Sequence, residues 1–379
     1  MLPMAPAKAL PPIGAADHRV NNLNLLRMLA ASAVIVSHSY PISLGPGTIE
    51  PLEPILQYSL GAVAVKVFFA ISGFLIMMSF ERRRSLLDFA VARFLRLIPA
   101  LVVVAVITAF LIGPLFTSLG LPAYFSHWRT LIYVPQTASM LTGPAGLPGV
   151  FTGTPYPGIN GPLWTLHYEL ACYIFLAVAG LLGFFRGRRF IFLIILYACF
   201  YALMRLVFPA HEAYAFLSLP FVVGMALYRY RDIIRLRWQI FLLLVAVAAL
   251  LGLANFAAFE ASTIALSYGT LWFGFLRVPA LLSYNRLGDY SYGVYIYGWP
   301  MQQMTITLLP GATPLQVMAI AFPAALACAI LSWTFVERPA LQMKRPLADA
   351  LAARLGSRRS GTGTDRPEDG AVAAEKSAG

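Results

Sequence analysis

Long apolar runs separated by short polar segments dominate the chain. Ten of these runs approach the ~20 residues that a helix needs to cross the hydrocarbon core of a bilayer. Each run has to be helical, because backbone polar groups find no water at that depth. We therefore predict an all-α integral membrane protein, a bundle of about ten transmembrane helices. The runs cover residues 23–41, 58–80, 92–113, 160–183, 189–208, 213–229, 238–256, 261–282, 288–309 and 314–336.

The arginines between the runs predict the orientation of the bundle. Cytoplasmic loops of membrane proteins are rich in Lys and Arg. With the N-terminus in the cytoplasm, nearly all arginine clusters fall on that side, and an even number of spans returns the C-terminus to it. The clusters are Arg82, Arg83 and Arg84; Arg186, Arg188 and Arg189; Arg229, Arg231, Arg235 and Arg237; and Arg277 with Arg286, whereas Lys66, Arg129 and Arg205 fall in the outer half or outer loops.

The polar segments divide the chain into three parts. Residues 1–22 lack an apolar run before a cleavage site, so we expect a short cytoplasmic arm rather than a secretory signal. Residues 23–336 form the transmembrane domain, and the basic tail 337–379 is expected to be largely disordered. The single long outside connection, 114–159, is rich in Gly, Pro and aromatic residues. Loops of that length are usually functional or disordered, and its aromatic residues favour an ordered platform for an acceptor substrate.

The composition agrees with a membrane protein and excludes several other classes. Of 379 residues, 59% are hydrophobic and 12% charged, and the mean hydropathy is +0.73, which excludes soluble, disordered and collagen-like chains. The net charge of +12 would suggest nucleic acid in a soluble protein, but here the basic residues lie in short runs between spans, so no nucleic acid partner is expected. Cys172, Cys199 and Cys328 lie in apolar runs without metal or redox spacing, which predicts neither a disulfide nor a metal site.

Ionisable side chains inside a span are costly and are therefore candidate functional residues. The first span carries Arg27 and His38. Eleven residues of α-helix place the two side chains on one face, ~16 Å apart along the axis, an arrangement suited to holding a long ligand at both ends. Arg27 could instead extend to lipid phosphates, and His38 could be a buried histidine satisfied by its neighbours.

The third span begins with two arginines on one face. Arg93 and Arg96 have a spacing of i, i+3, which places both guanidinium groups at the inner membrane surface. Two such groups could bind phosphates in a bidentate manner. The alternative is that they only anchor the helix on the cytoplasmic side.

The fourth span adds a carboxylate at the depth of the histidine. Trp164 lies near the outer interface and Glu169 about two turns further in. We predict a hydrogen bond between Glu169 and His38, direct or through a neighbour, because a carboxylate-oriented imidazole is a general base or nucleophile at neutral pH. His167 or the backbone could satisfy Glu169 instead. Lys66 could join this cluster or extend to the interface.

These residues together resemble the integral membrane acyltransferase family 3, over most of the chain. The resemblance rests on the spacing of Arg27 and His38, on Arg93 with Arg96, and on short motifs in a fixed order. These motifs are Phe68-Phe69 with Ile71-Ser72-Gly73-Phe74-Leu75, Asn160-Gly161 with Trp164-Thr165-Leu166, Gly288-Asp289 with Ser291-Tyr292-Gly293, and Val336-Glu337-Arg338-Pro339.

The resemblance implies transfer of an acyl group, most often acetyl, from cytoplasmic acyl-coenzyme A to a hydroxyl of a surface polysaccharide or a lipid-linked glycan in the bacterial inner membrane. Acyl-coenzyme A is then a substrate, and no bound cofactor or metal is implied. His38 is the catalytic residue that the resemblance implies, with Glu169 expected from its depth to orient it, and Arg27, Arg93 and Arg96 are expected to bind the phosphates of the donor. Site support is expected from Lys66, Ser72, Asn160 and Trp164.

Two questions remain open at this point. His38 could deprotonate the acceptor for direct transfer or could itself carry the acyl group. A transporter or flippase could also use these polar residues, as a path for protons or substrate.

Overall fold

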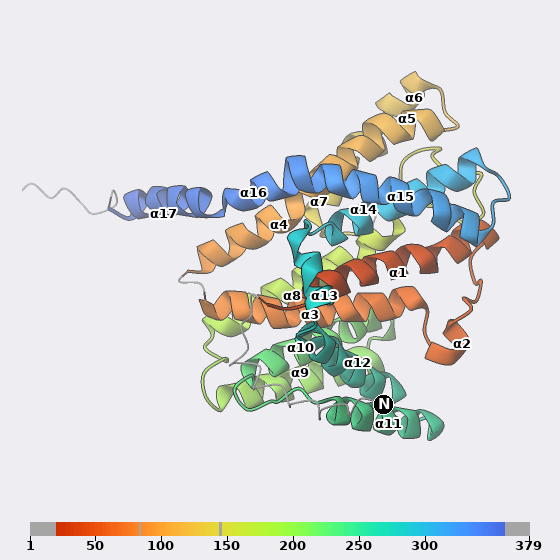
Figure 1. Cartoon of the computed structure of the whole chain (residues 1–379). Coiled ribbons are helices and arrows are strands. Elements are labelled where there is room, and N and C mark those ends of the chain that lie inside the picture. Colours follow the sequence, from red (N-terminus) through yellow and green to blue (C-terminus); the bar gives the residue numbers. More distant parts are fainter. Residues whose placement is uncertain (1–19, 83–84, 144–145, 361–379) are drawn as a thin grey trace, which may run out of the picture.

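The computed structural model describes residues 20–82, 85–143 and 146–360, and this part of the chain is helical without a β-sheet. Its long helices run side by side in a bundle, drawn lengthwise in Figure 1. The α-helices are α1 (Leu23–Leu44), α2 (Glu53–Leu56), α3 (Leu60–Arg82), α4 (Leu86–Ile107), α5 (Gly113–Phe116), α6 (Leu121–Ser126), α7 (Trp128–Ser139), α8 (Trp164–Leu181), α9 (Arg189–Leu206), α10 (Glu212–Arg229), α11 (Trp238–Leu253), α12 (Ala258–Gly274), α13 (Pro279–Leu282), α14 (Ser291–Leu308), α15 (Pro314–Ser332), α16 (Arg338–Gln342) and α17 (Lys344–Ser360).

Each of the ten apolar runs forms a helix, but the count of ten spans is not confirmed. Seven helices of the described residues are long and apolar enough to cross a membrane, or eight if the pair α12 and α13, bent by 89°, is one broken span. α11 has only 16 residues. α14 has 18 residues but includes the polar residues Gln302, Gln303 and Thr305. These side chains are buried against protein, which is where polar groups inside a membrane protein are tolerated.

α14 lies at the centre of the bundle. Fourteen of its 18 residues are buried. It packs along α15 and α1, and α1 also packs on α3. Asn22, just before α1, donates from its side chain to the carbonyl of Leu276 at 2.7 Å, which ties the start of α1 to the end of α12.

Two glycines allow α3 and α10 to approach closely. A Cβ at Gly73 would collide with the carbonyl oxygen of Phe221, and a Cβ at Gly224 would collide with that of Ala70. Small residues at helix interfaces in membranes permit such contact. The two helices form one of the most extensive contacts in the fold, and α3 in turn provides one wall of the candidate site.

The long connection predicted to lie outside folds into a compact unit in its described residues. Residues 114–159 contain most of α5 and all of α6 and α7, and α7 packs on α4. The Tyr124 hydroxyl donates to the carbonyl of Ala109 at 2.7 Å, and Tyr133, Val150 and Phe151 are buried beside it. The aromatic residues thus fill a small core, as expected for an ordered loop.

The prediction of a disordered tail from residue 337 is wrong for residues 338–360. α16 and α17 continue the direction of α15 and extend beyond the bundle (Figure 1). The apolar residues Leu347, Ala348 and Leu351 pack on Val91 and Leu95 of α4, a contact that the polar composition of the tail concealed. The predictions for residues 1–19 and 361–379 lie outside the described residues.

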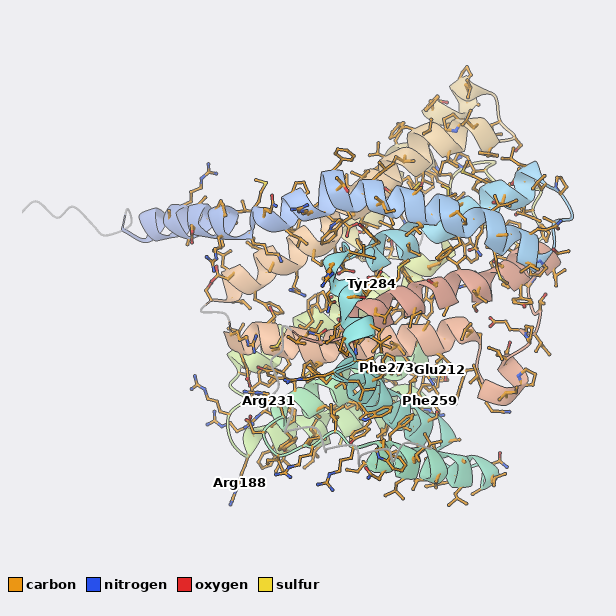
Figure 2. The ribbon with its side chains drawn as sticks, in the orientation of Figure 1. Arg188, Glu212, Arg231, Phe259, Phe273 and Tyr284 are labelled. Atoms are coloured by element: carbon orange, nitrogen blue, oxygen red, sulfur yellow. The ribbon has the colours of Figure 1, made fainter. Side chains whose placement is uncertain are left out.

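Arginines gather at the end of the bundle where α17 projects. Figure 2 shows Arg188 and Arg231 at that end, whereas Glu212 and Phe259 lie toward the other. Arg231 forms an ion pair with Glu81, at the end of α3, with a distance of 3.2 Å. This arrangement is the one expected if that end faces the cytoplasm.

Candidate active site

A pocket of about 600 Å³ runs along one face of α3. Its lining positions on α3 extend from Val65 to Arg82, seventeen residues apart, or ~25 Å along the axis. The remaining walls come from α1, α4, α8, α14, the turn that follows α15, α16 and the first residue of α17. The charged or hydroxyl-bearing residues of the wall are Arg27, Ser72, Ser79, Arg82, Arg93, Arg96, Thr165, Glu169, Tyr173, Asp289, Tyr292, Tyr295 and Lys344. The pocket therefore brings together the three predicted donor-binding arginines, Glu169 and Ser72.

Two of these arginines share one carboxylate. Arg27 donates to Oδ2 of Asp289 at 2.8 Å, and Arg96 donates to the same oxygen at 2.6 Å. Arg96 also lies 3.5 Å from Oε2 of Glu337, whose side chain is 1% exposed. Ser291 donates to the other oxygen of Asp289 at 2.7 Å. The network fixes both guanidinium groups at the pocket wall.

Asp289 and Glu337 are functional candidates that the reasoning on individual residues missed. Both belong to motifs that carried the family resemblance, but neither was assigned a role. A buried charge needs a partner, and this holds for Arg27 and Arg96 as it does for Glu169. Asp289 lies just before α14 and Glu337 in η6 (Trp333–Glu337), a turn of π-helix at the end of α15. The same rule, applied to charges at the ends of spans, would have found them.

Glu169 lies in the pocket wall and not against His38. Its Oε1 accepts hydrogen bonds from the hydroxyls of Tyr173 and Ser72, the latter at 3.4 Å. No hydrogen bond joins Glu169 to His38 in the described part of the chain, so the predicted pairing is wrong. The reason is packing: α1 and α8 each contact α3, and Glu169 bonds to Ser72 of α3 and to Tyr173 on its own helix, whereas His38 packs on Trp299 of α14.

His167 does not compete for Glu169. Its Nδ1 lies 3.1 Å from the carbonyl oxygen of Met140, and its Nε2 contacts the hydroxyl of Tyr214. A carbonyl can only accept, so Nδ1 carries the proton in the neutral ring and Nε2 accepts from the tyrosine. His167 is satisfied by these neighbours alone.

His38 lies beyond the outer end of the pocket, on the same face of α1 as Arg27. Arg27 contacts Asp289, and His38 contacts Trp299 with ring centroids 5.0 Å apart. Arg27 and His38 are eleven residues apart on α1, and the residues they contact, Asp289 and Trp299, are ten residues apart at the start of α14 and within it. Both side chains therefore face α14. The buried Nδ1 of His38 has no hydrogen-bond partner among the described residues. A ligand group is therefore able to bond there.

A small polar cluster closes the pocket one helical turn before His38. The hydroxyls of Thr165 and Tyr295 form a hydrogen bond of 2.6 Å, and they lie 3.1 and 2.8 Å from the carbonyl oxygen of Pro162, which accepts from the hydroxyl whose proton is not used between them. The rings of Phe68 and Tyr295 meet edge to face at 5.7 Å. Tyr295 and Trp299 are one turn apart on α14, ~6 Å along its axis. The pocket thus points at His38 but stops just short of it.

The other predicted support residues lie around this outer end. Asn160 donates to the carbonyl of Ile296 at 2.8 Å, and its buried Oδ1 has no partner in the described residues. Trp164 is 41% exposed and does not line the pocket. Lys66 does not line the pocket: its Nζ lies between the rings of Tyr58 and Phe259, 3.9 and 4.0 Å from their centroids. Lys66 thus holds α3 against α12.

Among the described residues, no group of His, Cys, Asp and Glu side chains could hold a metal ion. The site is thus a cationic pocket with a carboxylate at mid-depth and a histidine beyond its outer end. The fold and this site define a multi-pass helical membrane protein with a long pocket lined by several arginines.

This chain belongs to acyltransferase family 3. The family model, described as an acyltransferase domain, matches residues 20–334. The protein is accordingly an acyltransferase enzyme, as the resemblance of its motifs predicted, and the transporter alternative loses its support.

Two curated relatives agree with this assignment. An O-acetyl transferase of Shigella phage Sf6 is 30% identical over 348 residues, covering 87% of this chain and 98% of the relative. Nodulation protein 10 of Rhizobium leguminosarum bv. viciae is 30% identical over 364 residues, covering 87% of this chain and 95% of the relative. No solved structure matches the chain significantly.

Proposed function

We propose that the protein transfers an acyl group, most simply acetyl, from acyl-coenzyme A to a hydroxyl of a surface polysaccharide or lipid-linked glycan. The observation that carries the proposal is the alignment of the cationic pocket with His38 along α14. At the inner end, Arg27, Arg93 and Arg96 provide the cations that bind phosphate. At the outer end, His38 provides a group able to take a proton from a hydroxyl. In our proposal the protein lies in the bacterial inner membrane with both termini in the cytoplasm.

The donor binds with its phosphates on the arginine cluster. Arg27, Arg93 and Arg96 line the inner part of the pocket, where planar guanidinium groups suit phosphate oxygens. Asp289 holds Arg27 and Arg96 in place but also competes with the phosphates for them. The pantetheine arm then runs along α3, and its amide N–H groups come within reach of Glu169. The thioester reaches His38 once the Thr165–Tyr295 contact opens.

His38 supplies the base in this reaction. Its unprotonated ring nitrogen takes the proton of the acceptor hydroxyl as that oxygen attacks the thioester carbonyl carbon. The C–S bond breaks, the coenzyme A thiolate leaves, and the imidazolium returns the proton to the sulfur. The products are an ester and free coenzyme A, with His38 restored. An acyl-histidine intermediate would yield the same products in two steps.

The acceptor class is supported by the relatives and by the position of His38. One relative is named an O-acetyl transferase. The described residues of the 114–159 segment, beside the outer half of α4, offer a platform for a saccharide next to the outer end of the pocket.

His38→Ala tests the proposal. We expect transfer from acetyl-coenzyme A to fall by about a hundredfold or more, while coenzyme A binding to the purified protein stays within twofold, because the imidazole acts on the reacting atoms and not on the phosphates. Turnover and calorimetric affinity are measured on the same preparation. His211→Ala, in an exposed turn, is the matched control. Activity above a tenth of the parent protein would remove His38 from the mechanism.

A further inference from the structure

The donor pocket is completed by residues that lie after the family domain. The family match ends at residue 334, but the pocket wall also includes Leu341 and Lys344. Lys344 is the first residue of α17. The segment predicted as a disordered tail therefore places a cation beside the candidate donor site.

Packing against α4 holds this cation in place. Ala348 of α17 is buried against Val91 and Leu95 of α4. Arg93 and Arg96, which line the pocket, belong to the same helix. α4 therefore contacts α17 through one set of side chains and faces the pocket with another, so the position of Lys344 relative to the arginines is set by an apolar contact.

Lys344 and Arg82 mark the mouth of the pocket. Arg82 is the last residue of α3, ten residues beyond Ser72, or ~15 Å toward the arginine-rich end of the bundle. α15, η6, α16 and α17 follow one another along the chain, and Trp333 in η6 is the first of their residues to line the pocket. Lys344 lies eleven residues beyond Trp333. Both are thus at the end of the pocket farthest from His38.

The charges of the wall favour a ligand with several phosphates. Arg27 and Arg96 are partly neutralised by Asp289 and Glu337. Arg82 and Lys344 add two cations at the mouth. If the acyl end of the donor points to His38, the opposite end of coenzyme A, its adenosine 3′-phosphate, reaches the mouth while the pyrophosphate lies at the inner arginines.

We infer that Lys344, supported by Arg82, binds the 3′-phosphate of coenzyme A, and that α17 is part of the donor site. This inference rests on the proposed donor. In this inference α17, which lies outside the family domain, distinguishes coenzyme A from its 3′-dephospho form.

Calorimetry on the full chain in detergent tests the inference, with coenzyme A and 3′-dephospho-coenzyme A as ligands. We expect Lys344→Ala to weaken coenzyme A binding by about tenfold or more and binding of the dephospho form by less than twofold, since a charge-assisted contact to one phosphate is lost. Lys344→Arg should retain most of the affinity. Arg345→Ala removes the same charge from an exposed neighbouring position and should change neither affinity.

The outcomes separate the inference from the proposed function. Equal losses for both ligands, or equal effects of Lys344→Ala and Arg345→Ala, would overturn the role of Lys344 while leaving the donor assignment intact. If the parent protein binds neither ligand, the donor assignment itself fails. If Lys344→Ala does not fold, Lys344→Gln and Arg82→Gln provide the same comparison, and unchanged coenzyme A affinity in both would contradict the inference.

Discussion

Glu169 shows how a single carboxylate acquires its role from its contacts. Two hydroxyl groups, from Ser72 and Tyr173, donate to its Oε1, and its side chain is part of the pocket wall. His38 contacts Trp299 instead. A group in the wall acts on ligand binding, whereas a group bonded to the base would act on turnover.

We predict that Glu169→Gln raises the KM for acyl-coenzyme A more than it lowers kcat. The amide keeps the size of the side chain but removes the charge, and loss of a charged hydrogen bond to the donor would raise KM by about tenfold. Initial rates over a range of donor concentrations separate the two constants. Glu212→Gln, an exposed carboxylate at the start of α10 (Figure 2), should leave both unchanged. A hundredfold fall in kcat at constant KM would instead return Glu169 to the chemistry of His38.

Individual residues were predictable where the cost of a buried charge singles them out. This rule identified Arg27, His38 and Glu169 without any structure. It gave the depth of each side chain from its position in a span, but not which spans are neighbours. Glu169 bonds to Ser72 and Tyr173 and His38 packs on Trp299, and this choice of neighbours depends on packing that hydropathy does not encode.

At the level of helices, the close approach of α3 and α10 depends on two glycines. Gly73 lies next to Ser72, a wall residue, and faces the backbone of α10, while Gly224 of α10 faces the backbone of α3. A side chain at either position would have to separate the two helices, because the atoms it meets are backbone atoms that cannot rotate away. The wall of the pocket would move with α3.

Gly73→Ala is therefore expected to destabilise the protein. Overpacking typically costs roughly 1–3 kcal/mol, more than the gain in helix propensity from replacing glycine. Thermal unfolding of the detergent-solubilised protein should show a midpoint lower by several degrees. Gly252→Ala is the control, because a Cβ at this helical glycine of α11 meets open space. Equal unfolding midpoints for the two variants would contradict the close-approach argument.

Helices were predictable from the apolar runs, whereas their ends and the tail were not. Nine of the ten runs each contain one long helix and the run 261–282 is divided between α12 and α13, because a bilayer leaves the backbone little alternative to helix. α17 follows a different rule: its polar composition gives no membrane signal, and a few apolar side chains suffice once α4 provides a surface. Leu347, Ala348 and Leu351 form an apolar contact surface, and this becomes evident only when the facing helix α4 is known.

The whole molecule has two distinct ends. Arg82 and Lys344 mark the mouth of the pocket at the end where α17 projects and where Arg188 and Arg231 also lie (Figure 2). His38 lies toward the other end, beyond the contact of Thr165 with Tyr295. If donor and acceptor approach from opposite ends, neither substrate needs to cross the bilayer, and only the acyl group does.

This polarity predicts vectorial transfer. In sealed proteoliposomes, acyl-coenzyme A supplied only on the face of the arginine-rich end should release free coenzyme A on that face, and the acylated saccharide should form on the opposite face. The donor is too highly charged to cross lipid unaided, so its side of addition is well defined. Orientation is assigned by protease cleavage at the exposed α17 end, free coenzyme A is measured with an impermeant thiol reagent, and the ester is measured after separating lumen from medium. His38→Ala proteoliposomes provide the background of non-enzymatic hydrolysis. If both products appear on the donor face, the pocket is not a passage between the two faces, and the acceptor must instead approach from the arginine-rich end.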